Sequence, residues 1–297
     1  MELKNQEALG QQTTDEIIYR RSWPVRLAKA VLHSSYKIMP RRFYDFLYAF
    51  GRRILWFQQR WFYKVRFLAA KFYCKGEGLE RSRLVDLLLP FTMGGPLALE
   101  SAFDIVAKAE KEKVPGALVE CGVAKGGCCA MMALACRYYG GKRKLWLFDS
   151  YEGLPDPTAD DFKDGKTGEM VGPLSKGMLR TTLEQVRSLM LNTCQLSLDD
   201  VVFVKGWFQT TLPQAKNNIG KIAVLRLDGD WYESTKCCLE HLYDFVSMGG
   251  YIIIDDYATC YGSQRAVDGF LAKRRVCVAL VPDGRGGAWF QKPNKTI

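Results

Sequence analysis

Histidine is almost absent from this chain of 297 residues, which contains only His33 and His241. Mechanisms of the Ser-His-Asp type need a histidine as general base, so only these two residues could serve one here. His33 falls in a basic N-terminal segment. His241 falls in the middle of an expected helix, and we interpret it as a helical residue and not as a catalyst.

The ten cysteines contain no CxxC motif, although Cys128–Cys129 and Cys237–Cys238 are adjacent pairs. This spacing is typical of neither a zinc site nor a disulfide framework. Several lie in apolar runs, where cysteine behaves as a small hydrophobic residue. Cys128 and Cys129 begin an expected helix, which would stabilise a thiolate. Because no histidine base accompanies them, we interpret both as packing residues and expect free thiols in a reducing cytoplasm.

Long apolar segments are also lacking. The most apolar runs are interrupted by Arg52 and Arg53, or by Glu120 and Lys125, well before the roughly 20 residues that a transmembrane helix needs. The first residues do not show the basic-then-apolar order of a secretory signal. The sequence therefore predicts a cytoplasmic protein without a transmembrane helix.

Positive charge is concentrated at one end of the chain. The net charge is +10, and residues 1–75 contain 15 Lys and Arg against 5 Asp and Glu. Residues 76–297 contain 27 of each kind. We therefore expect two parts, a basic aromatic helical arm over residues 1–75 and a globular domain over residues 76–297.

Apolar residues in the arm recur at helical spacing, which predicts an amphipathic helix. They are Phe43, Leu47, Phe50, Ile54, Phe57, Trp61, Val65, Leu68 and Phe72, with Arg53, Arg60, Lys64 and Lys71 near one flank. Two interpretations stay open. A stripe of this kind is usually core, which favours packing on the body or within a homo-oligomer. The alternative is contact of residues 24–75 with a membrane surface or a partner. No nucleic-acid-binding motif accompanies the charge, so binding of nucleic acid is not expected.

From residue 96 onward, apolar strands alternate with helices, which indicates a parallel sheet covered on both faces. We predict an α/β fold with a Rossmann-like, doubly wound, mostly parallel sheet, helices on both faces, and an N-terminal helical extension. The expected strands are 116–123, 144–150, 200–208, 221–230 and 251–257, and the expected helices are 97–113, 126–140, 177–190, 233–250 and 262–274. Residues 155–178 read as a long loop and residues 277–292 as a closing hairpin.

The first two strands end in residues suited to a nucleoside-type cofactor. A glycine-rich turn, Glu120 to Gly127, enters a helix, where backbone can approach a ligand closely. Its spacing is not GxGxxG, so a pyrophosphate cofactor is not supported. Asp149 follows at the distance expected of a carboxylate that binds ribose hydroxyls. Alone, Asp149 could equally cap a helix or make a hydrogen bond within a loop.

The fourth and fifth strands end in four acids, Asp228, Asp230, Asp255 and Asp256. Carboxylates gathered at adjacent strand ends repel one another unless a cation lies among them. Oxygen ligands of this kind suit Mg²⁺. Capping of the next helix could account for Asp230 or Asp256, but not for all four acids.

Five sequence blocks, in this order and spacing, resemble the macrocin O-methyltransferase family. They are VECGVAKGG, LFDSYEGLP, VKGWFQTTLP, LDGDWYEST and GGYIIIDDY. With FTMGGPLALESAFDIV, the resemblance covers roughly residues 90–275 and leaves out the basic arm. It implies an S-adenosylmethionine- and Mg²⁺-dependent enzyme that methylates a hydroxyl, typically of a sugar on a natural product.

The resemblance also implies roles for individual residues. Asp149 binds the ribose hydroxyls, and Asp230 orients a water or the acceptor. The implied cofactor pocket consists of Met93, Glu120, Gly122, Gly126, Gly127, Asp149, Ser150, Gly206 and Trp207, and the implied metal ligands are Asp228, Asp255 and Asp256.

Our hypothesis for the mechanism is methyl transfer with Asp228 or Asp230 as general base and residues 155–178 as a lid. Three positions depart from the family pattern: Ala124 and Lys125 replace a bulky aromatic residue and an arginine, and Trp231 replaces the more usual leucine. These departures bear on the acceptor more than on the reaction. Two alternatives remain, a nicotinamide-dependent oxidoreductase and a non-catalytic protein that binds membranes or partners.

Overall fold

The computed structural model describes residues 39–163, 174 and 176–293. The chain divides into two compact units after Pro90. Residues 1–38, and His33 among them, lie outside the described part. The expected boundary between residues 75 and 76 stays a prediction.

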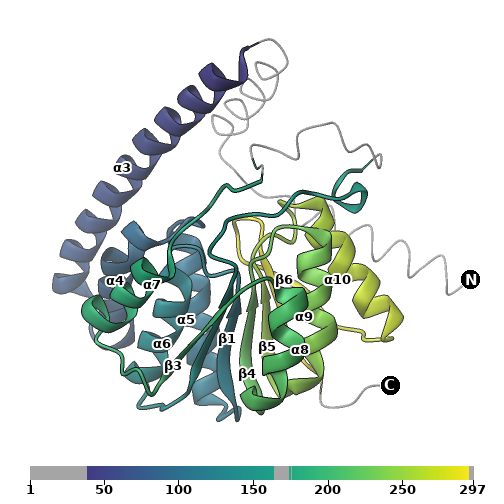
Figure 1. Cartoon of the computed structure of the whole chain (residues 1–297). Coiled ribbons are helices and arrows are strands. Elements are labelled where there is room, and N and C mark those ends of the chain that lie inside the picture. Colours follow the sequence, from purple (N-terminus) through teal and green to yellow (C-terminus); the bar gives the residue numbers. More distant parts are fainter. Residues whose placement is uncertain (1–38, 164–173, 175, 294–297) are drawn as a thin grey trace, which may run out of the picture. The chain divides into compact units, whose positions relative to one another are not determined.

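The smaller unit contains two helices, α3 (Arg41–Tyr73) and α4 (Glu77–Leu88), which contact each other, followed by the short η1 (Leu89–Phe91). Figure 1 shows α3 as one uninterrupted helix, which confirms the helix predicted from the apolar spacing. Pro40 precedes it, where a missing backbone N–H does no harm, and Cys74 ends it in an extended conformation. No helix in the described part of the chain is both long enough and apolar enough to cross a membrane.

The larger unit is built on a seven-stranded sheet in the order β3-β2-β1-β4-β5-β7-β6 (Figure 1). The first five strands are parallel, and β7 and β6 add an antiparallel hairpin at the β5 edge. The strands are β1 (Ala117–Cys121), β2 (Leu145–Asp149), β3 (Val201–Lys205), β4 (Ile222–Leu227), β5 (Val246–Ile254), β6 (Val281–Pro282) and β7 (Ala288–Gln291). The predicted mostly parallel sheet and its closing hairpin are confirmed.

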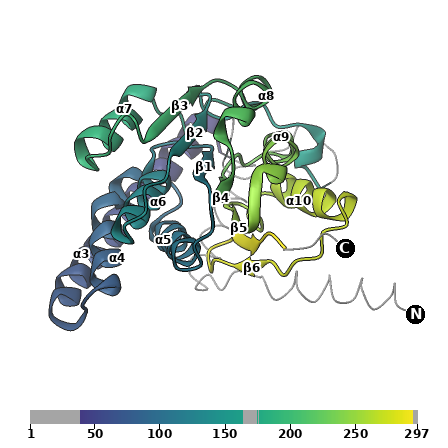
Figure 2. The same ribbon diagram turned by 90° about the horizontal axis from the view of Figure 1, so that it is seen from below.

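Helices cover both faces of this sheet, as predicted. In Figure 2, α5 and α6 lie on one face and α8, α9 and α10 on the other. The helices are α5 (Pro96–Lys111), α6 (Gly127–Tyr138), α7 (Leu183–Ser188), α8 (Phe208–Ile219), α9 (Tyr232–Leu242) and α10 (Tyr261–Lys273), and the short turns are η2 (Ala159–Asp161), η3 (Leu189–Thr193) and η4 (Tyr243–Phe245).

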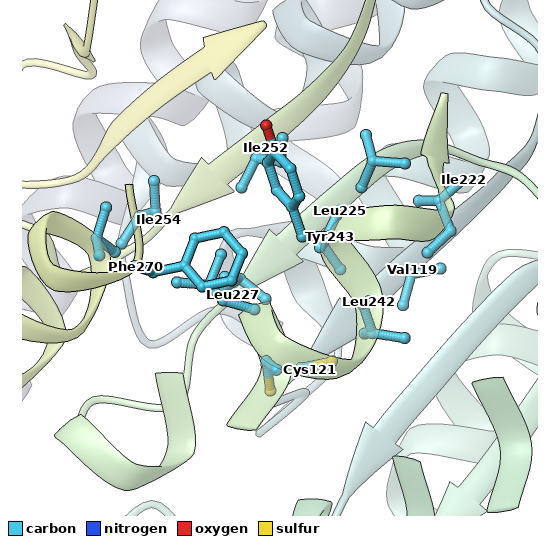
Figure 3. Close-up of a cluster of buried hydrophobic side chains, with 14 of the residues drawn as sticks. Val119, Cys121, Ile222, Leu225, Leu227, Leu242, Tyr243, Ile252, Ile254 and Phe270 are labelled. Atoms are coloured by element: carbon cyan, nitrogen blue, oxygen red, sulfur yellow. The ribbon is translucent and has the colours of Figure 1, made fainter. Parts of the chain in front are cut away.

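Alternate residues of the central strands build the core beneath α8, α9 and α10. Figure 3 shows side chains of β1, β4 and β5 gathered around Tyr243 and Phe270. Because successive strand residues point to opposite faces, Leu225 and Leu227 enter this core while Arg226 points to the other face. A single charged residue in an apolar strand thereby reaches the α5–α6 side of the sheet.

One helix and the bounds of two other helices differ clearly from the prediction. Helix α8 was not predicted, because Pro213 and the polar sequence QTTLPQAKNN hide its apolar positions, of which Leu212 and Ile219 are buried. Residues 246–250 belong to β5 and not to a helix extending through residue 250, since α9 ends at Leu242. Helix α7 begins after Thr182, whose side chain and that of Gln185 form a capping box, and not at residue 177.

The ends of β1 and β4 approach so closely that only glycine fits at position 122. A Cβ on Gly122 would overlap the backbone carbonyl of Asp228, and its φ of 89° lies in the left-handed region. This contact brings the glycine turn against the acidic segment that follows β4.

We predict that Gly122→Ala destabilises the protein by at least about 3 kcal/mol, since neighbouring backbone must move in addition to the left-handed strain. Gly140→Ala is the matched control, because Gly140 has a similar φ of 76° and no atom within 4 Å of the added Cβ. It should cost only about 1–2 kcal/mol. Urea unfolding measures both variants, and equal losses would contradict the proposed steric contact.

Candidate active site

The predicted site residues gather where the parallel strands end. Strands β1, β2, β4 and β5 end at Cys121, Asp149, Leu227 and Ile254, and each is followed directly by a predicted site segment. The register places Leu227 beside both Cys121 and Ile254. The topology therefore brings the glycine turn, the DGD acids and the DD acids to one edge of the sheet.

A buried arginine that the sequence reasoning missed lies at the centre of the acids. The Arg226 side chain is 2% exposed and forms ion pairs with Glu120, Asp255 and Asp228, the last at 2.8 Å. Arg226 pairs with Glu120 in the β1–β4 register, and Asp228 follows two residues later on the same face. The sequence did contain a signal for this role, because Arg226 is the only charged residue within IAVLRL.

A second arginine reaches the same cluster from the β6–β7 connection. Arg285 forms an ion pair with Asp255 and donates from Nη2 to the Asp255 carbonyl oxygen at 3.0 Å. Its loop is shaped by Asp283, whose Oδ1 accepts from the backbone N–H groups of Arg285, Gly286 and Gly287 at 2.8–3.0 Å. Part of the positive charge that was expected among the acids is therefore supplied by two guanidinium groups.

The acids nevertheless outnumber these cations, and their pKa values show it. Burial raises the pKa of Glu120 to about 7 despite Arg226. Burial and neighbouring carboxylates raise the pKa values of Asp228, Asp230 and Asp256. Burial also acts on Asp255, but Arg226 and Arg285 outweigh it and lower its pKa. Five carboxyl groups against two guanidinium groups leave a site that an additional cation would stabilise.

Two groups of side chains have ligand atoms close enough to share a metal ion. In the first, Asp228, Asp255 and Asp256 each offer an oxygen, all within 4.8 Å of one another. These are the predicted metal ligands, and an oxygen-only set suits Mg²⁺. In the second, Asp230 and Asp256 are joined by Cys260 at the same spacing, and a thiol is a poorer ligand for Mg²⁺. Both guanidinium groups contact Oδ1 of Asp255, so Oδ2 takes no part in these two ion pairs.

Asp149 binds the backbone of the glycine turn. Its Oδ2 accepts from the N–H groups of Val123 and Ala124 at 2.8 and 3.0 Å, and its Oδ1 accepts from that of Tyr151 at 2.6 Å. The loop hydrogen bond that was left open is thus present. An ionised carboxylate has about four acceptor positions, so the ribose role of Asp149 stays a prediction. The Ser150 hydroxyl accepts from Glu152 N–H at 3.1 Å within the same turn.

The remaining glycines allow neighbouring segments to approach the start of α6. Gly126 has a φ of 86° and caps the helix. A Cβ on Gly127 would lie 2.5 Å from the Phe91 carbonyl oxygen, so the segment before α5 lies against the turn. Partly buried Met93 belongs to this segment, and a Cβ on its neighbour Gly94 would lie 3.5 Å from Arg285 Cζ. Met93 is therefore near both the turn and the acidic cluster.

The end of β3 joins the same edge through backbone contacts. Gly206 N–H donates to the Asp149 carbonyl oxygen at 2.9 Å, and Trp207, 37% exposed, caps α8. A Cβ on Gly229 would lie 3.4 Å from a ring carbon of Phe208, so the start of α8 borders the DGD turn. The predicted contacts of Gly206 and Trp207 with the cofactor stay predictions.

Neither the thiols nor the histidine described in the structure behaves as a catalytic group. Burial raises the pKa of Cys128 to about 12 and that of Cys129 well above the usual range, so both stay protonated. All ten cysteines are free, as predicted. His241 Nδ1 lies 3.3 Å from Lys216 Nζ, a contact between α9 and α8.

The loop after β2 is anchored to the DGD turn by Trp231, one of the positions that depart from the family pattern. Buried Trp231 donates from Nε1 to the Pro155 carbonyl oxygen at 3.1 Å. The next residue, Tyr232, donates its N–H to Asp161 Oδ1 at 2.6 Å. At the base of the loop, Leu154 exchanges backbone hydrogen bonds with Gly177 and Met178. Residues 164–173 and 175 of the expected lid lie outside the described residues.

We predict that Arg226→Met destabilises the protein by about 3–5 kcal/mol, because it leaves buried carboxylates without their cation. Arg83→Met is the control, since Arg83 forms an exposed pair with Glu80 at 2.6 Å and such pairs contribute about 0–1 kcal/mol. Chemical denaturation measures both. Similar losses in the two variants would show that Arg226 does not hold the cluster together.

We predict that Trp231→Phe loosens residues 156–163, because phenylalanine cannot donate to Pro155. Loss of one hydrogen bond of about 1 kcal/mol should speed amide exchange in this segment about fivefold. Trp146→Phe is the matched control, since Trp146 is buried but its Nε1 has no hydrogen-bond partner among the described residues. Unchanged exchange in Trp231→Phe, measured by mass spectrometry, would disprove the anchoring role.

The comparisons with known proteins agree with this geometry. The model of the macrocin O-methyltransferase family matches residues 76–292. Demethyldecarbamoylnovobiocin O-methyltransferase of Streptomyces niveus is 38% identical over 202 residues, which cover 68% of this chain and 75% of that enzyme. A tetracenomycin-C 4'-O-methyltransferase of Streptomyces olivaceus, named for an 8-demethyl-8-(2,3-dimethoxy-alpha-L-rhamnosyl) compound, is 42% identical over 168 residues, covering 56% of this chain and 62% of that enzyme.

A solved structure shows the same relationship. The O-methyltransferase NovP superposes with a TM-score of 0.61 at 37% sequence identity, covering 69% of this chain and 83% of that chain. The family match spans well over half of the chain, and the sequence blocks, the sheet order and the acids at the strand ends are consistent with it. This chain belongs to the macrocin O-methyltransferase family and is an S-adenosylmethionine-dependent O-methyltransferase.

Proposed function

We propose that this chain transfers the methyl group of S-adenosylmethionine to a hydroxyl group of a sugar-like small molecule, with Mg²⁺ as a second cofactor. The observation that carries the Mg²⁺ requirement is the set of Asp228, Asp255 and Asp256 oxygens within 4.8 Å beside the glycine turn. The raised pKa values of Asp228 and Asp256 support it, because burial and then the neighbouring carboxylates disfavour their ionised forms, which a bound cation would stabilise.

The difficulty of the reaction is the acceptor, because an alcohol is almost wholly protonated at neutral pH. A divalent cation bound by these aspartates supplies Lewis-acid polarisation, which lowers the pKa of an acceptor hydroxyl. Arg226 and Arg285 keep Asp255 ionised and oriented. The protein thus presents at least one fully charged ligand before any cofactor binds.

Asp230 is the better of the two candidate bases. Asp228 already accepts a hydrogen bond from Arg226 at 2.8 Å, which disfavours proton uptake. Burial and neighbouring carboxylates raise the pKa values of both acids, so the Arg226 hydrogen bond to Asp228 is what distinguishes them. A carboxylate whose pKa is raised toward the working pH is a more effective proton acceptor, and such groups contribute about 10²–10⁴-fold to rate.

The glycine turn and Asp149 form the proposed cofactor side of the site. Asp149 holds the turn in place through Val123 and Ala124, and the N-terminus of α6 follows. Glu120, expected in the cofactor pocket, is paired with Arg226, so we propose that it shapes the pocket indirectly.

A sugar-like acceptor is supported by the rhamnosyl group in the name of the Streptomyces olivaceus relative. Trp231 in place of leucine, with the loop that it anchors, is a feature of this chain beside the acids that would border an acceptor. No feature of the described residues favours the nicotinamide-dependent alternative. The expected homo-oligomer and cytoplasmic location stay predictions.

We predict that Asp256→Asn abolishes most methyl transfer and weakens Mn²⁺ binding at least about tenfold, a loss that even outer-shell partners of a metal cause. Asp256 is chosen for substitution in place of Asp255, because replacing Asp255 would also remove the carboxylate that Arg226 and Arg285 both contact. Asp199→Asn, an exposed site, is the control. Mn²⁺ binding is followed by electron paramagnetic resonance, and S-adenosylmethionine binding by calorimetry should persist.

EDTA provides the second arm of this test. Methyl transfer to a rhamnosyl-bearing acceptor, the kind of compound in the name of the Streptomyces olivaceus relative, should fall to background in EDTA and return with added Mg²⁺. Full activity in EDTA would remove the metal from the mechanism while leaving methyl transfer itself in place.

A further inference from the structure

Helix α3 has an apolar stripe that runs along its whole length. At 100° per residue, the stripe positions fall within an arc of about 100°. Eight of them are exposed large side chains: Phe43, Phe50, Ile54, Phe57, Trp61, Val65, Leu68 and Phe72. Phe57 and Trp61 are each 66% exposed, and Phe72 is 85% exposed. Isolated exposed apolar residues need no explanation, but a continuous row of them marks an interaction surface.

The opposite side of α3 is already used within its own unit. Ala70 is buried and Tyr63 and Phe67 are partly buried, and α3 contacts α4. Their positions lie about half a turn from the stripe. The core-like burial expected of the stripe is therefore found on the other face of the same helix.

Basic side chains line one edge of the stripe. Arg53, Lys64 and Lys71 are exposed and fall within about 80° of Trp61 on the helix circumference. The helix as a whole carries eight Lys or Arg residues and one acid, Asp45. An apolar, aromatic-rich face beside a row of cations is complementary to a surface in which an anionic layer covers an apolar layer.

We propose that α3 is a membrane-surface helix that binds the face of a bilayer containing anionic lipids. The stripe would enter the boundary between headgroups and acyl chains, and the basic row would contact lipid phosphates. The charges exclude a spanning arrangement, in agreement with the finding that no described helix can cross a membrane. The proposal does not depend on the methyl-transfer chemistry.

Charge decides between a membrane and a second copy of this chain. Two stripes packed antiparallel would bring the two basic rows to the same side of the interface, and in a parallel pair each row would lie beside uncharged residues, because residues 41–75 offer only Asp45 to compensate the charge. Like charges along a helix interface destabilise it. Anionic lipid headgroups instead attract the side chains of the basic row.

The test is vesicle flotation of the full-length chain. Vesicles of phosphatidylcholine are compared with vesicles containing about 30% phosphatidylglycerol. We expect flotation with the anionic vesicles, and release when NaCl rises from about 0.1 M to about 1 M, because the Debye length falls from about 10 Å to about 3 Å.

Two variants separate the apolar and electrostatic contributions. Phe57→Ser with Trp61→Ser removes the centre of the stripe. Arg53→Gln, Lys64→Gln and Lys71→Gln together remove the basic row, which should weaken binding about 100-fold. The matched control removes three exposed lysines of the larger unit, Lys142→Gln, Lys144→Gln and Lys221→Gln, and should bind as the parent chain does. Circular dichroism and S-adenosylmethionine binding confirm that each variant is folded.

Each other outcome overturns the proposal. Failure of the parent chain to float with anionic vesicles would disprove it directly. Equal flotation with neutral vesicles, or equal loss in the lysine control, would remove the specific role of the basic row. A mass that halves in the Phe57→Ser and Trp61→Ser variant, measured by light scattering without lipid, would instead identify a second copy as the occupant of the stripe.

Discussion

The ion-pair cluster around Arg226 is the interaction on which the rest of the site depends. It joins Glu120 of β1, Asp228 after β4 and Asp255 after β5 through one buried guanidinium. Replacing such a network with apolar residues often costs little, whereas breaking it is expensive. Its value here is positional, because it ties three strand ends together at the edge where the cofactors are proposed to bind.

The same cluster explains how this fold holds so many acids in one place. Arg226 and Arg285 compensate part of the charge, and Asp255 is the acid that benefits most. Asp228, Asp230 and Asp256 retain raised pKa values. A protein that compensated every acid internally would have no affinity left for a divalent cation. The partial compensation is consistent with the proposed metal site.

Two further features lie outside the ion-pair cluster. Trp231 anchors the loop after β2 over the DGD turn, beside the region proposed for the acceptor. Helix α3 carries an exposed apolar stripe with a basic edge. The first borders the proposed acceptor region, and the second is the surface proposed to bind a membrane.

The sequence alone determined the fold class, the family and the edge of the sheet at which the predicted site residues gather. Alternation of apolar strands with helices is local information, and so is the helical spacing of residues 43–72. It did not reveal α8, where Pro213 and polar residues mask the pattern, or the end of α9, where an apolar run passes directly from helix into β5. Only the tertiary structure decided that Arg226 and Arg285 neutralise part of the acids, that Asp149 braces the glycine turn, and that the α3 stripe is exposed. The physical reason is that each of these depends on which segments, far apart in the sequence, come into contact in the folded chain. Residue spacing brings acids to the ends of strands, but the register between strands determines which charges they meet there.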